Sequence, residues 1–274
     1  MFSSLLRGAI IAVTIVLFFL FLIPLLERRM VFHPVRHPHG NWAPEQFDLP
    51  VEDHWFETED GVTLHGWYAR AEQPVGTTLL WSQGNAGNLT YRMQNMRLLL
   101  DYGIDVFIYD YRGYGRSQGN PTEVGIYADA RAAYDYLARE LQIAPREIVL
   151  FGRSLGSAVA VDLALQRDVA GVILEAPLTN ARDMSRRLVP LLPVHRVIST
   201  QLDSLAKIPN INVPVLIIHG DRDNVVPIEQ GKRLYAAAGQ PRQFYTVEGA
   251  GHNDTFVVGG NAYFELLRDF VSGL

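Results

Sequence analysis

Residues 147–156 of the chain read EIVLFGRSLG, an apolar run that leads directly into a turn centred on Ser154. The apolar run is typical of a buried β-strand, and residues 154–166 after it have the composition of a helix. Gly152 and Gly156 remove side chains that would collide in so tight a turn. A serine there is held in a strained backbone conformation with its hydroxyl exposed. The stretch therefore predicts a strand, a nucleophilic serine and a helix, in that order.

A second interpretation of this turn is a glycine-rich strand-to-helix connection that binds a phosphate at the helix N-terminus. A nucleotide site would show Gly-x-Gly-x-x-Gly, or a lysine after the second glycine, and neither is present. The nucleophile is therefore the better interpretation, provided that a base and an acid can be found elsewhere in the chain.

Strand-like and helix-like segments alternate on both sides of the turn. The strand-like segments are 77–82, 105–111, 147–151, 171–175, 215–219 and 243–247, and the helical ones are 89–102, 124–141, 154–166, 229–238 and 261–270. Most of the strand-like segments are continuously apolar, as in a parallel sheet covered by helices on both faces. Segments 51–56 and 63–68 flank a Glu-Asp-Gly turn and predict an antiparallel hairpin. We expect one α/β domain over 51–274, with a mostly parallel eight-stranded sheet flanked by helices.

A serine nucleophile needs a general base, and the chain has eight histidines. His219 lies inside a strand and is interpreted as a packing residue, His65 lies in the hairpin, and His195 lies in a variable-looking segment. His252 differs because it follows the last strand in the loop 248–254, where two glycines allow the chain to bend. Loops beyond the carboxyl ends of parallel strands meet at one rim of the sheet, so His252 is the candidate base for Ser154.

The base needs an acid to orient it, and two aspartates, Asp221 and Asp223, follow the strand 215–219. Asp221 also suits the capping of a turn. With either one, the chain order is serine, aspartate, histidine, which is the order of one hydrolase class.

Backbone amides that could stabilise an oxyanion come from two places. One is the amide of Leu155, directly after the candidate nucleophile. The other is expected in residues 82–88, SQGNAGN, where the Asn85 amide is the candidate donor. Taken alone, this second segment could equally be an ordinary turn rich in glycine and asparagine.

The N-terminus carries a separate signal. Residues 8–26 form a run of 19 residues without a charge, and a helix of this length spans roughly 28 Å, close to the hydrocarbon core of a bilayer. We predict a single-pass anchor over 1–27 and a solvated juxtamembrane segment over 28–50. A cleaved signal peptide and a buried helix are the alternatives, although no Ala-x-Ala cleavage pattern follows the run. The excess of arginine after the run places the domain on the cytoplasmic side.

Composition excludes several other classes of function. The chain has 274 residues, 24 Lys+Arg against 29 Asp+Glu and a net charge of −5, so no basic footprint for nucleic acid is present. Cysteine is absent, which excludes disulfides, a thiolate nucleophile and a cysteine zinc site. His33, His37 and His39 are interrupted by prolines and are expected in a solvated loop rather than in a metal site. We expect no cofactor and no metal.

Five segments together resemble the α/β-hydrolase superfamily, and more narrowly its membrane-anchored branch of α/β-hydrolase domain proteins that contains acyl-protein thioesterases. They are 83–88 (QGNAGN), 110–115 (DYRGYG), 152–156 (GRSLG), 214–223 (PVLIIHGDRD) and 248–254 (EGAGHND). The resemblance implies that Ser154, Asp223 and His252 are nucleophile, acid and base. One departure is Gln83, where the family usually has the histidine that braces the oxyanion loop.

The resemblance implies a membrane-anchored serine hydrolase that cleaves carboxylic esters or thioesters of small-molecule or lipid-linked acyl substrates through an acyl-enzyme. A serine peptidase with the same residues and a catalytically silent scaffold are the alternatives. Residues 176–213 fall where lids insert in this fold. Their apolar side chains suit an acyl-binding wall or a surface that rests on lipid, and they suit an ordinary core-facing helix equally well.

Overall fold

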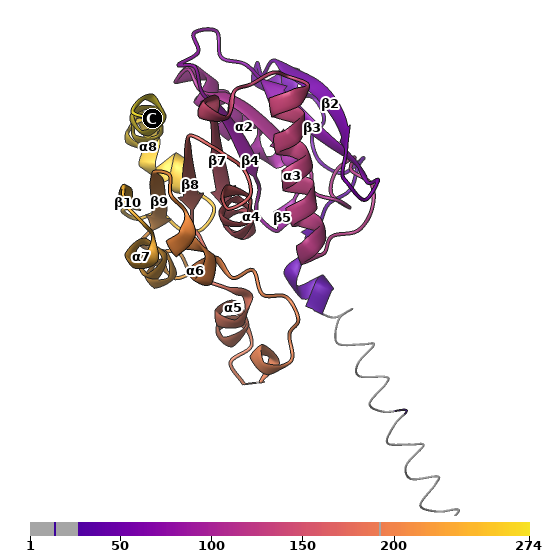
Figure 1. Ribbon diagram of the computed structural model, residues 1–274, viewed down its shortest axis with the longest axis vertical. Helices are drawn as coiled ribbons and strands as arrows, with labels where there is room; N and C mark the ends of the chain where they lie inside the picture. The colour runs from indigo at the N-terminus through magenta and orange to yellow at the C-terminus, as the bar shows by residue number, and fades with distance from the viewer. Residues whose placement is uncertain (1–13, 15–26, 192) are drawn as a thin grey trace, which may run out of the picture.

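The computed structural model of the protein describes Thr14, residues 27–191 and residues 193–274. Its centre is an eight-stranded sheet in the order β10-β9-β8-β7-β4-β6-β3-β2 (Figure 1). Strands β4, β6, β7, β8, β9 and β10 are parallel, and the hairpin β2–β3 joins antiparallel to β6. The strands are β2 (Val51–Glu57), β3 (Thr63–Ala69), β4 (Thr78–Ser82), β6 (Asp105–Tyr109), β7 (Ile148–Arg153), β8 (Gly171–Glu175), β9 (Val215–Gly220) and β10 (Arg242–Val247). The predicted mostly parallel sheet with an antiparallel hairpin is confirmed.

Helices cover both faces of this sheet and create two apolar cores. On one face, α3 (Glu123–Arg139), α4 (Leu155–Ala164) and α7 (Ile228–Ala237) contribute side chains such as Ile126, Val159 and Leu234. On the other face, α2 (Met93–Asp101) and α8 (Thr255–Ser272) contribute Met96 and Leu267. The strands between the two cores are buried on both sides, which explains their continuously apolar sequences.

The last helix begins earlier than its sequence predicts. We expected a helix over 261–270, whereas α8 extends from Thr255 to Ser272. Gly260 interrupts it with a φ of 51° and a ψ of −140°, so two helical pieces meet at a kink. The first piece is too short to show a helical period in the sequence, and it follows the loop of His252 directly.

The segment after the predicted anchor is exposed at His33, His37 and His39, as expected for a solvated loop, and it also makes contacts with the domain that were not predicted. Residues 27–31 are helical, and β1 (His33–Pro34) pairs in parallel with β5 (Ala86–Gly87) in a separate two-stranded sheet. Phe32 and Leu49 are buried in the two cores. These contacts join segments about 50 residues apart, so no local pattern in 28–50 indicates them.

Between β8 and β9 the chain leaves the sheet and forms the region that we call the lid, residues 176–213. It contains α5 (Ala181–Leu188), η4 (Val194–Arg196), α6 (Ser204–Lys207) and η5 (Ile208–Asn210). In Figure 1, α5 projects from the body at the end where residues 27–31 lie.

Within the residues described here, no helix has both the length and the apolar character needed to cross a bilayer. Apart from Thr14 and Glu27, the predicted anchor over 1–27 lies outside these residues.

Candidate active site

Ser154 occupies the tight turn between β7 and α4, as its sequence predicts. Its φ of 52° and ψ of −116° lie in a region that side-chain-bearing residues rarely adopt. A Cβ atom on Gly156 would lie 1.9 Å from the backbone oxygen of Ser82, and one on Gly152 would lie 2.4 Å from that of Gly156. Both glycines are therefore required by close backbone approach, and the strained turn directs the Ser154 hydroxyl away from the sheet.

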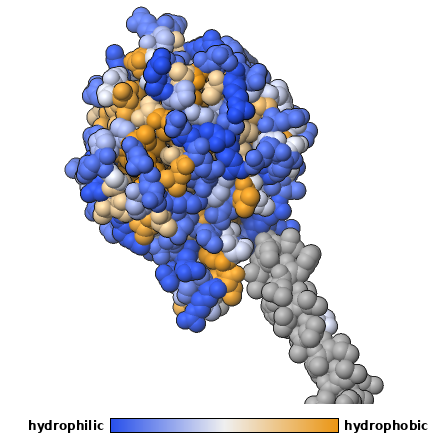
Figure 2. All heavy atoms as spheres, in the orientation of Figure 1, coloured by the Kyte–Doolittle hydropathy of each residue, from blue (hydrophilic) through white to orange (hydrophobic). Residues whose placement is uncertain are grey.

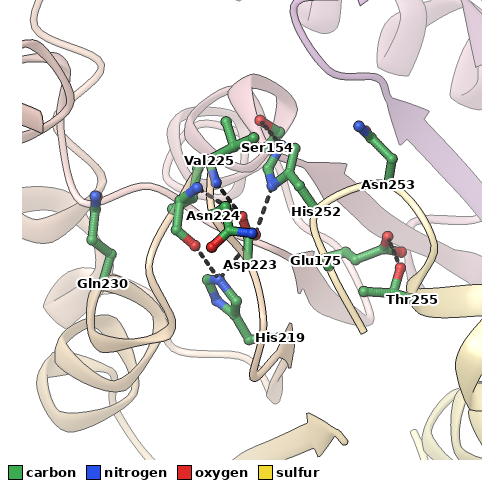
Figure 3. Close-up of polar contacts among 12 residues, drawn as sticks. Ser154, Glu175, His219, Asp223, Asn224, Val225, Gln230, His252, Asn253 and Thr255 are labelled. Carbon is green, nitrogen blue, oxygen red and sulfur yellow. Dashed lines mark hydrogen bonds and ion pairs between the residues drawn. The ribbon is translucent and has the colours of Figure 1, made fainter. Parts of the chain in front are cut away.

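The Ser154 hydroxyl is part of a continuous hydrogen-bonded chain of three side chains (Figure 3). The Nε2 atom of His252 lies 3.0 Å from the Oγ atom of Ser154. On the other side of the ring, Nδ1 lies 2.6 Å from the Oδ2 atom of Asp223. The three residues come from the segments that follow β7, β9 and β10. Ser154 and His252 are 98 positions apart in the sequence, and Asp223 and His252 are 29 positions apart.

Asp223 is held as an ionised acceptor. Burial by itself would raise the pKa of Asp223, but hydrogen bonds from His219 and His252 outweigh burial and hold that pKa well below its ordinary value. Its Oδ1 atom also accepts the backbone amides of Val225 and Val226, each at 2.8 Å. The carboxylate is therefore fixed in orientation and charged at neutral pH.

The competing aspartate has a structural role. The Oδ1 atom of Asp221 accepts the backbone amide of Gly249 at 2.6 Å, which ties the turn after β9 to the turn after β10. Of the two aspartates, only Asp223 reaches His252 in the structure.

His219 contributes to the site, although its position inside a strand indicated a packing residue. It is fully buried at the end of β9, and its Nε2 atom lies 2.8 Å from the backbone oxygen of Val226 and 3.4 Å from the Oδ2 atom of Asp223. Figure 3 shows Asp223 between the rings of His219 and His252. In the sequence, the one indication of this contact was that His219 and Asp223 are four positions apart.

A second residue that the sequence analysis missed is Arg153, next to the candidate nucleophile. Its Nε atom donates to Glu175 at 3.0 Å, and its Nη2 atom donates to the backbone oxygen of His252 at 2.7 Å and to Asn253 at 2.9 Å. Glu175 also accepts the hydroxyls of Thr255 and Tyr263. This buried network joins the turn of Ser154, the end of β8 and the loop of His252.

The loop after β4 brings the candidate oxyanion donors beside Ser154. A Cβ atom on Gly84 would lie 3.6 Å from the Cβ atom of Ser154, so the loop backbone passes directly over the serine. Among the described residues, the backbone amides of Asn85 and Leu155 have no acceptor, and both residues line the same cavity as Ser154. Two such backbone amides can donate hydrogen bonds that stabilise a developing oxyanion.

Gln83, the departure from the family pattern, still braces this loop. Its Nε2 atom donates to Asp110 at 2.8 Å, and its backbone oxygen accepts the hydroxyl of Tyr111 at 2.8 Å. The glutamine side chain thus ties the loop to the buried carboxyl group of Asp110.

The segment after the predicted anchor braces the loop from outside. The backbone amide of His33 donates to the Asn85 oxygen at 2.9 Å, and the Asn85 side chain donates to the Val31 oxygen at 3.1 Å. The side chain of Asn88 donates to the oxygens of Val35 and His39. The position of Asn85 therefore depends on residues 31–39.

An apolar cavity of about 280 Å³ opens beside Ser154. Its walls come from the lid and from residues 27–31, and include Val31, Leu178, Met184, Val194 and Ile198. No group of three or more acidic, histidine or cysteine side chains that could hold a metal ion occurs in the described parts of the chain. The arrangement suits nucleophilic attack on a carbonyl whose apolar portion lies in the cavity.

Comparison with known proteins bears on the family and the fold of this chain. A family model described as "serine aminopeptidase, S33" matches residues 86–206, and one described as "alpha/beta hydrolase fold" matches residues 192–257. The human alpha/beta hydrolase domain-containing protein 17B is 36% identical over 224 residues, which cover 81% of this chain and 75% of the relative. The chain belongs to the α/β-hydrolase family. Within this α/β-hydrolase family it belongs to the branch of α/β-hydrolase domain proteins.

Two further matches extend over most of the α/β-hydrolase. An uncharacterised protein of Mycobacterium tuberculosis is 36% identical over 250 residues, which cover 90% of this chain and 87% of the relative. The solved structure of an esterase from Pyrococcus furiosus superposes with a TM-score of 0.75 at 21% identity and covers 89% of this chain and 98% of the esterase. At that identity the superposition shows the fold alone.

Proposed function

We propose that this α/β-hydrolase is a serine hydrolase that cleaves carboxylic ester or thioester bonds through an acyl-enzyme on Ser154. The observation that carries the proposal is the hydrogen-bonded chain from Ser154 through His252 to Asp223, at the edge of an apolar cavity. A silent scaffold has no need for a strained serine with an aligned imidazole beside it.

Each group then has one task in the reaction. The Oγ atom of Ser154 attacks the carbonyl carbon while Nε2 of His252 takes its proton. The amides of Asn85 and Leu155 stabilise the oxyanion, and Asp223 stabilises the imidazolium and holds its tautomer. The imidazolium protonates the departing alcohol or thiol, and water repeats the sequence on the acyl-enzyme to release the acid.

The cavity supports an acyl substrate over a peptide substrate. A peptidase that selects a free amino terminus, the activity named by one family description, would need a carboxylate to receive the amine. Among the described residues that line the cavity, the one carboxylate is Glu27. Both of its oxygens accept hydrogen bonds from Ser199 and Thr200 of the lid. We therefore propose a small-molecule or lipid-linked acyl substrate.

We further propose that residues 1–27 anchor the enzyme in a membrane as a single pass, with the hydrolase domain, 51–274, on the cytoplasmic side. The uncharged run over 8–26 and the arginines after it support this arrangement. The protein then acts on substrates that are concentrated at the bilayer.

The test is fluorophosphonate labelling of the full-length protein, followed by hydrolysis of p-nitrophenyl esters and acyl thioesters of graded chain length. Labelling of Ser154 and hydrolysis of at least one series are expected, with both lost in Ser154→Ala. Full labelling of Ser154→Ala would refute the assignment of the nucleophile. Labelling of the natural protein without hydrolysis of any ester or thioester would refute the proposed substrate class.

A further inference from the structure

The lid carries an exposed apolar surface that the domain itself does not cover. Leu191 is 94% exposed, Leu188 is 60% exposed and Val197 is 57% exposed. Met30, in the helical turn before β1, is 47% exposed. We call these four side chains the lid face. Large apolar side chains gathered in this way on a projecting element usually mark a contact site.

Positive charge accompanies the lid face. Residues 181–198 contain four arginines, Arg182, Arg186, Arg187 and Arg196, and one acidic residue, whereas the whole chain has a net charge of −5. All four arginines are exposed. Figure 2 shows hydrophilic and hydrophobic spheres together on this projecting part of the molecule. Exposed leucines with exposed arginines nearby in the sequence match a lipid surface of negative charge in both hydrophobicity and sign.

The lid face is continuous with the cavity beside Ser154. Met30, Leu188 and Val197 are exposed and also line the cavity, so they form its rim. An acyl chain that enters over this rim passes from one apolar environment to another.

If residues 1–27 form the proposed anchor, the contacts of Glu27 place the lid on the side of the molecule that faces the bilayer. Glu27 is buried, and its Oε2 atom accepts the backbone amide and the hydroxyl of Ser199 at 2.9 and 3.0 Å. The uncharged run 8–26 ends one residue before Glu27. The residue that directly follows this run is therefore tied to the lid.

We propose that the lid face rests on an anionic lipid surface, so that the rim of the cavity opens at the bilayer and an acyl chain enters without crossing water. This inference rests on the proposed function, because it assigns the source of the substrate of the same site. A second copy of this chain is the other occupant considered for the lid face, and it is an outcome of the test.

The absence of cysteine allows a site-specific test with the full-length protein. Leu191→Cys, labelled with an environment-sensitive nitrobenzoxadiazole probe, reports on the lid face. Leu165→Cys is the matched control. Leu165 is a leucine that is 40% exposed, and it lies at the C-terminal end of α4, whereas Ser154 lies at the N-terminal end. Both variants are placed in phosphatidylcholine vesicles with and without phosphatidylglycerol, containing brominated acyl chains.

We expect the probe at position 191 to show a blue shift and strong quenching, both largest with phosphatidylglycerol. We expect the probe at position 165 to show water-like emission. Water-like emission at 191 in both vesicles would overturn the inference. Concentration-dependent self-quenching at 191 without lipid would identify a second copy as the occupant and would overturn it as well.

A charge-removal arm tests the role of the arginines. Arg182 and Arg196 have no hydrogen-bond or ion-pair partner for their side chains in the described parts of the chain, so Arg182→Gln/Arg196→Gln removes charge with little effect on packing. The control Arg139→Gln/Arg146→Gln removes the same charge at exposed sites, 75% and 84% accessible, away from the lid. The lid variant is expected to lose most of the quenching at 191 and the control to retain it. Equal quenching in both would refute the electrostatic part.

Failure of this inference is distinguishable from failure of the proposed function. Ser154→Ala is expected to keep the quenching at position 191 while it loses hydrolysis of a soluble short-chain ester. A protein that hydrolyses the soluble ester but shows no quenching at 191 retains the proposed function and refutes the lid contact.

Discussion

The Nη2 atom of Arg153 lies 2.7 Å from the backbone oxygen of His252, which joins the turn of the nucleophile to the loop of the base. The same guanidinium is paired with Glu175, and both side chains are almost completely buried. Apart from the hydrogen bond between Ser154 and His252 themselves, Arg153 joins these two loops through an ion pair that contacts neither the hydroxyl nor the imidazole. We therefore expect this ion pair to help align His252 with Ser154.

Arg153→Met is expected to damage both stability and turnover. Removal of one partner of a buried ion pair costs about 3–5 kcal/mol of the free energy of unfolding. Displacement of His252 by about 1 Å would lower kcat about 100-fold. Urea denaturation and steady-state kinetics on a soluble ester measure the two effects.

The matched control is the double variant Arg153→Met/Glu175→Gln, which leaves no unpaired buried charge. It is expected to recover much of the stability but not the turnover, because the loop of His252 still lacks its donor. Natural kcat in a folded Arg153→Met protein would show that the loop holds His252 without this contact.

Asp223→Asn is expected to lower turnover by about four orders of magnitude, because an amide favours the wrong tautomer of the histidine. Asp221→Asn keeps an oxygen for the amide of Gly249 and is expected to retain near-natural turnover. Kinetics of the two variants on the same ester compare them directly. A larger loss in Asp221→Asn would mean that the wrong acid has been assigned.

Asp110→Asn is expected to change how stability depends on pH. Burial raises the pKa of Asp110 to about 7, despite hydrogen bonds from Leu89 and Gln83. Between about pH 4 and pH 7 the folded carboxyl is therefore protonated and the unfolded one ionised, so stability falls as pH rises, by at most about 1.4 kcal/mol per pH unit.

Asparagine cannot titrate, and its oxygen can still accept both hydrogen bonds. The difference in the free energy of unfolding between the natural protein and Asp110→Asn should thus decrease from pH 4 to pH 7, as measured by urea denaturation. A constant difference over this interval would contradict the raised pKa.

Truncation should reveal the role of the segment before the domain. A chain that begins at Glu27 keeps the contacts of Val31 and His33 with Asn85 and is expected to hydrolyse a soluble ester at the natural rate. A chain that begins at Asn41 loses them and is expected to be slower by about 10²–10³-fold, the usual effect of losing one oxyanion donor. Circular dichroism checks that both chains fold. Equal rates would show that the loop holds Asn85 without residues 27–40.

The parts of the fold that the sequence predicted are those with a local signature. Apolar runs such as 215–219 identified buried strands, and the glycines around Ser154 identified the turn before its geometry was known. Ser154, Asp223 and His252 could be grouped because each follows a strand, and the carboxyl ends of parallel strands meet at one rim.

The parts that the sequence did not predict depend on pairs distant in the chain. Glu27 and Ser199 are 172 positions apart, and Arg153 and His252 are 99 apart. Neither residue of such a pair carries a pattern that indicates the other. His219 was interpreted correctly as buried, but its contact with Asp223 depends on how the loop after β9 folds back.

The positive φ of Ser154 has a consequence for the stability of the whole molecule. A serine held there costs roughly 1–3 kcal/mol in backbone strain, and alanine would have the same strain because it also has a Cβ atom. Glycine would not, so a search for stabilising substitutions would favour glycine at position 154 and remove the nucleophile. At this position, conformational stability and reactivity are in direct opposition, and the sheet and helix on either side must supply the free energy that keeps the serine in place.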